Sequence, residues 1–134
     1  MFGALDISTS ALVAQRTRLD VISANVANRD AIYDTEGNYA PFRRRIPVFA
    51  TGDPATGNSQ GVHVTRIDLD QSPFRKVYDP GDPNADTSGY VDYPNIDPAF
   101  EMINAMEASR AYEANITAAQ ATKQMIEASL RLLA

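Results

Sequence analysis

The sequence offers few side chains that could act as nucleophiles, general bases or metal ligands. It has no cysteine, and its only histidine is His63, in the strand-like stretch GVHVTRI. Strand alternation places His63 on the face opposite Val62 and Val64, and a histidine without a second histidine or a cysteine is more often structural or exposed than catalytic. The sequence contains no nucleophile elbow, phosphate-binding loop or dinucleotide fingerprint. We therefore predict no catalytic residue, no cofactor and no metal site.

Three aspartates, Asp79, Asp82 and Asp86, are clustered in the segment YDPGDPNAD. Clustered carboxylates are the ligands that calcium prefers. Their spacing differs from that of the calcium-binding loop, and two prolines stiffen the backbone that would have to wrap around the ion. We therefore interpret the cluster as an acidic turn.

Three consecutive arginines, Arg43, Arg44 and Arg45, form a basic run. Alternation along an extended chain directs Arg44 to one side and its two neighbours to the other. One interpretation is solvated surface charge. The other is a contact between subunits with the acidic stretch 79–101, which has no lysine or arginine, because guanidinium groups form bidentate pairs with carboxylates.

Length and charge narrow the class of protein. The 134 residues fit one domain, and the apolar fraction of 44% is typical of a folded chain. The net charge of −5 argues against general binding to nucleic acid or to an anionic membrane. No apolar run approaches the ~20 residues that span a bilayer, and the first basic residue is Arg16, so no secretory signal peptide is expected. By these rules the protein stays in the cytoplasm unless it is exported without a cleaved signal.

The elements that position these residues are two long helices at the ends of the chain. Residues 4–28 and 99–133 contain neither proline nor glycine. Asp97 and Pro98 suit the cap and first position of the second helix, and Asn28 could cap the first in the left-handed conformation. The second helix would be roughly 52 Å long. Because this length exceeds a compact domain of this size, we expect either that the helix breaks or that its end projects and is covered by another molecule.

Apolar residues recur every seven positions in both helices, which predicts that they pair as a coiled coil. The row in the first helix is Leu5, Leu12, Leu19 and Val26, with Ile22 between the last two. The rows in the second helix are Tyr112, Ala119, Ile126 and Leu133, and Met102, Ile116 and Leu130. Asn115 is either an exposed polar residue or the donor of an interhelical hydrogen bond that fixes the register.

The middle of the chain has a different composition. Residues 31–98 hold six of the seven glycines and all eight prolines. We predict strands at 42–49, 61–69 and 74–78, with a turn-rich connector at 51–60 that makes a hairpin plausible. Pro47 would place its strand at an edge or end it early. The expected fold is mainly α with a small β insert. Its parts are an N-terminal helix in 1–30, a β-rich insert in 31–96 and a C-terminal helix in 97–134.

Several motifs resemble those of one family. DVISANVAN, residues 20–28, resembles the amino-terminal signature of bacterial flagellar rod and hook proteins, and SRAYEAN, residues 109–115, resembles their carboxy-terminal signature. SPFRKVYDPG at 72–81 and GYVDYPN at 89–95 narrow the resemblance to the short proximal-rod subunits. The resemblance runs almost from end to end. One departure is the charged pair at 29–30, where the family usually has small polar residues.

The resemblance implies a non-enzymatic structural subunit of the rod, the hollow drive shaft that crosses the periplasm and transmits torque. It implies that the terminal helices lie in the inner wall of a helical tube. The partners would be copies of the chain, other rod subunits and the flagellar type III export apparatus, which needs no cleaved signal peptide. Neither nucleic-acid binding nor direct membrane insertion is expected.

The residues expected in contacts between subunits come from the apolar rows, the two signatures and the arginine run. They are Leu5, Leu12, Leu19, Ile22, Asn25, Val26, Asn28, Arg43, Arg44, Arg45, Tyr112, Asn115, Ile116, Ile126, Leu130 and Leu133. Two other functions compete with this one. A helical adaptor or chaperone would bind a partner helix in a groove and form a small, defined oligomer. A small hydrolase or metal enzyme would need convergent polar residues that the sequence does not offer.

Overall fold

The computed structural model describes residues 2–134. Within that range the elements are α1 (Phe2–Ala27), β1 (Arg45–Asp53), β2 (Asn58–Leu69), β3 (Arg75–Tyr78), β4 (Tyr90–Tyr93) and α2 (Pro98–Leu133). β1 pairs with β2 and β3 pairs with β4, so the strands form two separate antiparallel hairpins. The fold is mainly helical with a small β part in the middle of the chain, as predicted from the sequence.

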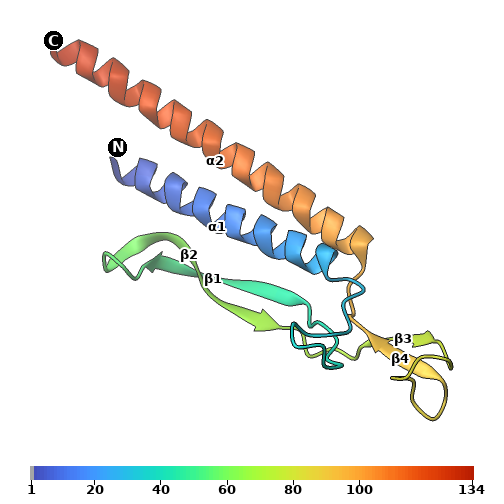
Figure 1. The fold of residues 1–134 in the computed structure, drawn as a ribbon. Helices are drawn as coiled ribbons and strands as arrows, with labels where there is room; N and C mark the ends of the chain where they lie inside the picture. Colours follow the sequence, from blue (N-terminus) through green and yellow to red (C-terminus); the bar gives the residue numbers. More distant parts are fainter. Residues whose placement is uncertain (1) are drawn as a thin grey trace.

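The molecule is elongated, and α1 is the central one of three layers (Figure 1). α2 runs antiparallel along one side of α1, and the β1–β2 hairpin covers the other side (Figure 1). The β3–β4 hairpin and the loops near it form a lobe at the end of the molecule away from both termini. We call residues 30–42 and 71–97 the distal lobe. Because α2 has 36 residues and α1 has 26, the C-terminal end of α2 extends beyond α1.

The helix boundaries follow local chemistry. The Asp97 carboxylate accepts a hydrogen bond from the Ala99 N–H at 3.0 Å, and Pro98 occupies the first turn, as predicted for α2. α1 begins earlier than predicted and includes Gly3. The prediction that Asn28 takes the left-handed conformation is wrong, since among the described residues only glycines have positive φ. Asn28 instead donates its side-chain amide to the Ala24 carbonyl at 2.8 Å.

The β1–β2 hairpin is longer and its turn shorter than predicted. The strands extend into the expected 51–60 connector and leave only residues 54–57 as the turn. Pro47 pairs with Ile67 in mid-strand, which is tolerated because each strand of a two-stranded sheet is an edge strand. Residues 42–44 precede the strand rather than forming part of it, and β4 was not predicted.

The helices pair, but the buried row of α2 is not the predicted one. Glu101, Ala108 and Thr122, at multiples of seven residues, are its buried positions. Tyr112, Ile116 and Ile126 are half-buried. The prediction that Met102, Leu130 and Leu133 are buried by pairing of the two helices is wrong within this chain, because their exposed fractions are 66%, 61% and 84%.

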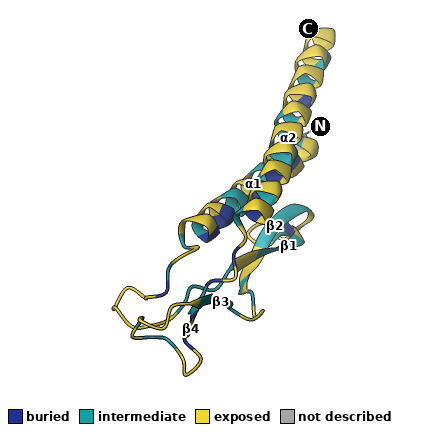
Figure 2. Ribbon diagram, turned by 90° about the vertical axis from the view of Figure 1, so that its right-hand side faces the viewer, coloured by how far each residue is buried: buried dark blue, intermediate teal, exposed yellow. Residues whose placement is uncertain are grey.

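Two physical reasons explain the difference. α1 does not reach the last turns of α2, so within residues 2–134 no helix packs against Leu130 and Leu133 (Figure 2). Glu101 takes the buried position next to Met102, because its carboxylate pairs with Arg44. Met102 lies one residue further along, about 100° around the helix, and is therefore turned toward solvent. On α1, Ile22 is buried and Leu5, Leu12 and Leu19 are half-buried, whereas Val26 is exposed.

Candidate subunit interface

Asn25 attaches the start of the β1–β2 hairpin to α1. Its amide nitrogen donates to the Arg45 carbonyl at 3.0 Å, and its amide oxygen accepts from the Arg45 N–H at 2.9 Å. The Asn25 side chain thereby makes the two hydrogen bonds that a paired strand would make. Asn25 is only 1% exposed, so both amide groups need such partners.

A second hydrogen bond holds the other end of the hairpin against α1. The Val62 N–H donates to the Ser10 hydroxyl at 3.1 Å. The neighbouring Gly61 has a φ of 92°, and a Cβ there would lie 2.8 Å from the Ser10 oxygen. Glycine at this position therefore permits both the backbone conformation and the close approach of β2 to α1.

Arg44 joins the segment before β1 to α2. Its Nε donates to the carboxylate of Glu101, which is fully buried, and its Nη1 lies 3.9 Å from Asp70. A buried carboxylate is costly unless it is paired, so this contact is required where α1, β1 and α2 converge. Hydrogen bonds from the Ser72 hydroxyl and N–H lower the pKa of Asp70, and the charges of Arg44 and Arg43 add to this effect.

The three arginines of the basic run have different surroundings. Arg43 donates to the carbonyl oxygens of Asp70 at 3.3 Å and Ser72 at 2.9 Å, and its guanidinium lies over the Phe74 ring. Arg43 and Arg44 thus both bind groups of their own chain, so the interpretation as solvated surface charge does not describe either of them. The Arg45 side chain is exposed, with its guanidinium 5.1 Å from the centre of the Phe42 ring.

The polar residues along the inner side of α2 bond to their own helix. Asn115 donates to the Ala111 carbonyl at 2.8 Å and Thr122 to the Ala118 carbonyl at 3.0 Å. Asn115 is half-buried, and across residues 2–134 its side chain makes no hydrogen bond to α1. Neither of the two interpretations of Asn115 therefore describes its place in this chain.

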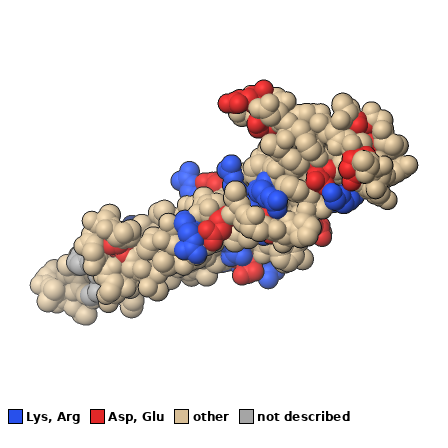
Figure 3. Space-filling model, turned by 90° about the horizontal axis from the view of Figure 1, so that it is seen from below, with Lys and Arg blue, Asp and Glu red and all other residues tan. Residues whose placement is uncertain are grey.

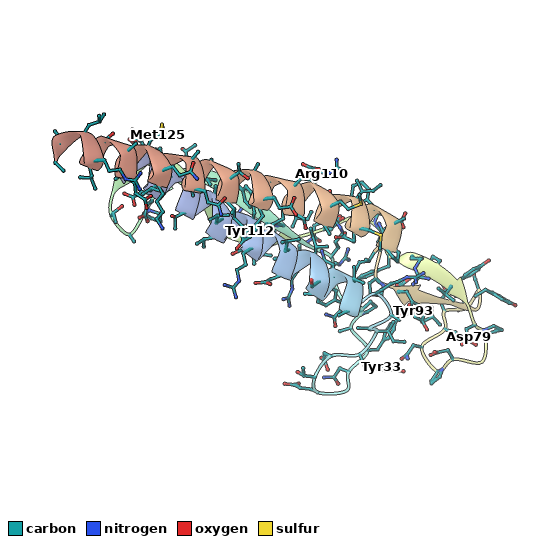
Figure 4. The ribbon with its side chains drawn as sticks, turned by 90° about the horizontal axis from the view of Figure 1, so that it is seen from above. Tyr33, Asp79, Tyr93, Arg110, Tyr112 and Met125 are labelled. Carbon is teal, nitrogen blue, oxygen red and sulfur yellow. The ribbon has the colours of Figure 1, made fainter. Side chains whose placement is uncertain are left out.

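The exposed surface of α2 carries a series of large apolar side chains at both of its ends. Figure 4 shows Met125 and Arg110 on the side of α2 turned away from α1, with Tyr112 toward α1. Exposed alanines, among them Ala118 and Ala121, lie between the two ends. The large exposed apolar residues of α2 are Phe100, Met102, Ile103, Met106, Met125, Leu130, Leu132 and Leu133.

Several of these residues were missed in the sequence, although a signal existed. Ala114, Ala118, Ala121, Met125, Ala128 and Leu132 follow alternating steps of four and three residues and are all exposed. That spacing defines a second stripe on α2, distinct from the one that meets α1. The stripe is weak in the sequence because alanine contributes little to an apolar pattern. The stripe contains no charged residue, so a further helix could lie along it.

The residues first considered for chemistry lie apart from one another. His63 is half-buried in β2, with its Nδ1 2.7 Å from the Gly52 carbonyl, so the ring donates from Nδ1. Asp79, Asp82 and Asp86 lie in the loop between β3 and β4. An Asp86 oxygen accepts from the N–H groups of Ser88 and Tyr90, and the bond from Tyr90 contributes most to lowering the pKa of Asp86.

Within residues 2–134 no three His, Cys, Asp or Glu side chains gather in a way that could hold a metal ion. Neither α1 nor α2 contains a stretch apolar enough, over sufficient length, to cross a bilayer.

Comparisons with known proteins cover most of the chain. Residues 5–37 match the family described as flagella basal body rod protein, and residues 87–132 match the C-terminal family of the flagellar basal body rod FlgEFG proteins. The first match contains Asn25 and most of α1, and the second contains β4 and nearly all of α2. Arg44 and Arg45 lie between the two matches.

Three relatives with the name flagellar basal-body rod protein FlgC align along almost their full length. The Bacillus subtilis protein is 41% identical, over 98% of this chain and 97% of its own. The Salmonella typhimurium protein is 43% identical, over 95% of this chain and 93% of its own. The Borreliella burgdorferi protein is 36% identical, over 99% of this chain and 97% of its own. With such identity across whole chains, this protein belongs to the FlgC family of flagellar basal-body rod proteins.

Proposed function

We propose that this chain is a structural subunit of the flagellar basal-body rod and polymerises through its terminal helices into the hollow shaft that transmits torque. The observation that carries the proposal is the exposed face of α2. It presents an uncharged stripe of alanines and large apolar residues along a helix that extends beyond α1. Such a surface is stable in water only when another molecule covers it.

The pairing of α1 and α2 is proposed to be a coiled coil that continues between subunits. The buried positions of α2 at multiples of seven residues support this arrangement. Two of these side chains, Ala108 and Thr122, are small, and the Thr122 hydroxyl bonds to its own helix, which lets the two helices approach closely. Leu130 and Leu133 would then be covered by a neighbouring subunit rather than by α1.

We further infer that the protein reaches the rod through the flagellar type III export apparatus, and that it resides where the rod crosses the periplasm. Passage through a narrow channel requires an unfolded chain. Since the sequence has no cysteine, no disulfide has to be broken before export or formed after it. Neighbouring subunits in the rod would be copies of this chain and other rod proteins.

The proposal is tested by placing a charge on the exposed stripe. Met125→Asp should leave the melting temperature of the isolated chain nearly unchanged, because this side chain is 56% exposed. It should nevertheless remove the chain from purified basal bodies and abolish swimming. Gln124→Asp adds the same charge one residue away, off the stripe, and serves as the control. Normal incorporation of Met125→Asp would contradict the proposal, and a small, defined oligomer of the wild type in place of a rod would favour an adaptor.

A further inference from the structure

The two ends of the molecule differ in charge. The distal lobe contains eight of the seventeen acidic residues and only two of the twelve basic ones. Those two, Arg75 and Lys76, are paired with Asp30 and Asp92 in the same lobe. Figure 3 shows the basic side chains mostly over the middle of the molecule and the acidic ones prominent at the lobe.

A groove at the middle of the molecule concentrates the opposite charge. It lies between α1, β1 and the start of α2, has a volume of about 450 Å³, and is lined by three arginines, Arg18, Arg44 and Arg45. Glu101 is the one carboxylate in its lining. Two carboxylates outside the lining also approach these arginines: Asp70 lies 3.9 Å from Arg44, and Glu107 lies 3.6 Å from Arg18. The positive charge of the groove that has no carboxylate partner among residues 2–134 is therefore that of Arg45. We call this groove the arginine groove.

The three arginines differ in the ion pairs that they make within the chain. Arg44 is held by Glu101. Arg18 lies 3.6 Å from Glu107, whose side chain is 69% exposed, and such a pair contributes little. Among residues 2–134, Arg45 has no carboxylate oxygen within 4 Å, while its backbone is fixed by Asn25. Arg45 therefore has a fixed backbone and a guanidinium that lacks an anionic partner among the residues that the structure describes.

The acidic turn at the tip of the distal lobe is ordered before any partner binds. The Asp79 N–H donates to the Gly89 carbonyl at 2.9 Å, which closes the loop. Asp82 and Asp86 each use one carboxylate oxygen to accept backbone N–H groups inside the loop. The Asp79 side chain makes no hydrogen bond within the described chain, so its carboxylate is available. A loop ordered in this way loses little conformational entropy on binding.

We propose that the acidic turn 79–86 of one copy of this chain binds in the arginine groove of a second copy, with Asp79 facing Arg45. The turn does not reach the groove of its own chain, because Figure 4 shows Asp79 on a loop that projects away from the helix pair. The groove and the turn are different surfaces, so the contact is head-to-tail and repeats from copy to copy. The inference rests on the proposed rod function and names which surfaces meet in it.

Cross-linking of introduced cysteines tests the contact directly, because the natural chain has no cysteine that could react. Cells lacking the native chain would make two variants together, an epitope-tagged Arg45→Cys chain and an untagged Asp79→Cys chain. A short bismaleimide is used in place of oxidation, because an arginine–aspartate contact separates the two Cα atoms by more than the ~7 Å that a disulfide can bridge. Treated basal bodies should contain a dimer of the two variants. Arg66→Cys replaces Arg45→Cys in the control, since Arg66 is an exposed arginine of the same hairpin but lies outside the groove. That control should give no dimer with Asp79→Cys.

If the chains are present in basal bodies and the mixed dimer does not form, the inference is overturned while the rod function stands. If the wild-type chain is itself absent from basal bodies, the rod function fails instead. Cross-links only to other rod proteins would also overturn the choice of a second copy as the partner.

Charge reversal gives an independent answer if the cysteine variants are not incorporated. Arg45→Glu and Asp79→Arg should each lower the amount of chain per basal body about tenfold, since like charges then face each other. The chain carrying both reversals should recover most of that loss, because each contact again joins opposite charges. Single reversals without effect, or a double reversal no better than either single one, would overturn the inference.

Discussion

The amide of Asn25 and the backbone of Arg45 are joined by a reciprocal pair of hydrogen bonds, 20 residues apart in the sequence. One side chain thus fixes the position of the hairpin on α1 and, through the chain, the positions of Arg44 and Arg45. The contact is made entirely within the chain. Asn25, which lies in the amino-terminal signature, therefore has a role in the fold that is separate from any contact with a neighbouring subunit.

Asn25→Ala should destabilise the isolated chain by about 1–3 kcal/mol, because backbone groups of Arg45 lose their partner. Asn28→Ala is the matched control. The Asn28 side chain bonds only to a carbonyl of its own helix, so we expect a loss of less than about 1 kcal/mol. Urea unfolding followed by circular dichroism measures both. Equal losses for the two variants would show that the Asn25 contact does not hold the hairpin.

Arg44 and Glu101 should behave as a coupled pair. Arg44→Met leaves a buried carboxylate with no charged partner and should cost about 3–5 kcal/mol, whereas Arg44→Met with Glu101→Leu should recover most of that loss. The free energy of unfolding of the two single variants and the double variant gives the coupling. Simple addition of the single effects would mean that the ion pair contributes nothing.

Leu12→Asp should prevent incorporation into the rod. Leu12 is half-buried in α1, and burying a leucine is worth about 1.5–3 kcal/mol, so a charge there opposes pairing of the helices. Thr9→Asp, at an exposed position one turn earlier, is the control. Soft-agar swimming and the amount of chain in basal bodies are the measurements. Normal swimming by Leu12→Asp would count strongly against pairing through this row.

Limited trypsin digestion of the isolated chain should first remove the end of α2. Arg131 and Lys123 are exposed on the part of the helix that has least support from α1. Arg18 and Arg44 are half-buried, so cleavage there should be slower. Mass spectrometry of early fragments identifies the order of cleavage. Resistance at Lys123 and Arg131 in a verified monomer would mean that the exposed end is more stable than its contacts indicate.

Acid should destabilise the chain through its loop aspartates. Hydrogen bonds from backbone N–H groups lower the pKa of Asp34, Asp53 and Asp86. A group with a lowered pKa in the folded state stabilises that state above its unfolded pKa of about 3.9, and this contribution is lost as the pH falls further. The melting temperature should therefore drop below about pH 4. Changing all three to asparagine keeps acceptors but removes the titration, so the drop should become smaller.

The helices could be predicted from the sequence because their signals are local. Absence of proline and glycine, together with the Asp97 cap, locates α2 to within a residue. The buried row of α2 could not be predicted in the same way, because it depends on a distant partner. Glu101 is buried only because Arg44, 57 residues earlier in the chain, supplies the opposite charge.

The short β elements are also difficult to predict from local sequence signals. β4 has four residues, and its pairing with β3 is made across a loop, so no periodic pattern marks it. In the sequence Asn25 stands out only as part of a family signature, and its two hydrogen bonds to Arg45 depend on how segments 20 residues apart pack together. Asn115 likewise satisfies its amide within its own helix, an outcome that its position in the sequence does not determine.

The central position of α1 has a consequence for how the chain folds. One side of α1 packs against the β1–β2 hairpin and the other against α2, which comes from the opposite end of the sequence (Figure 1). α1 therefore cannot bury both faces until nearly the whole chain is available for folding. Bringing α2 back to α1 closes a long loop, which is slow because conformational entropy is lost before the contacts form. If the chain is exported through a narrow channel as we propose, it lacks a completed core until both termini have emerged. Late folding of this kind would keep the chain unfolded throughout the proposed export.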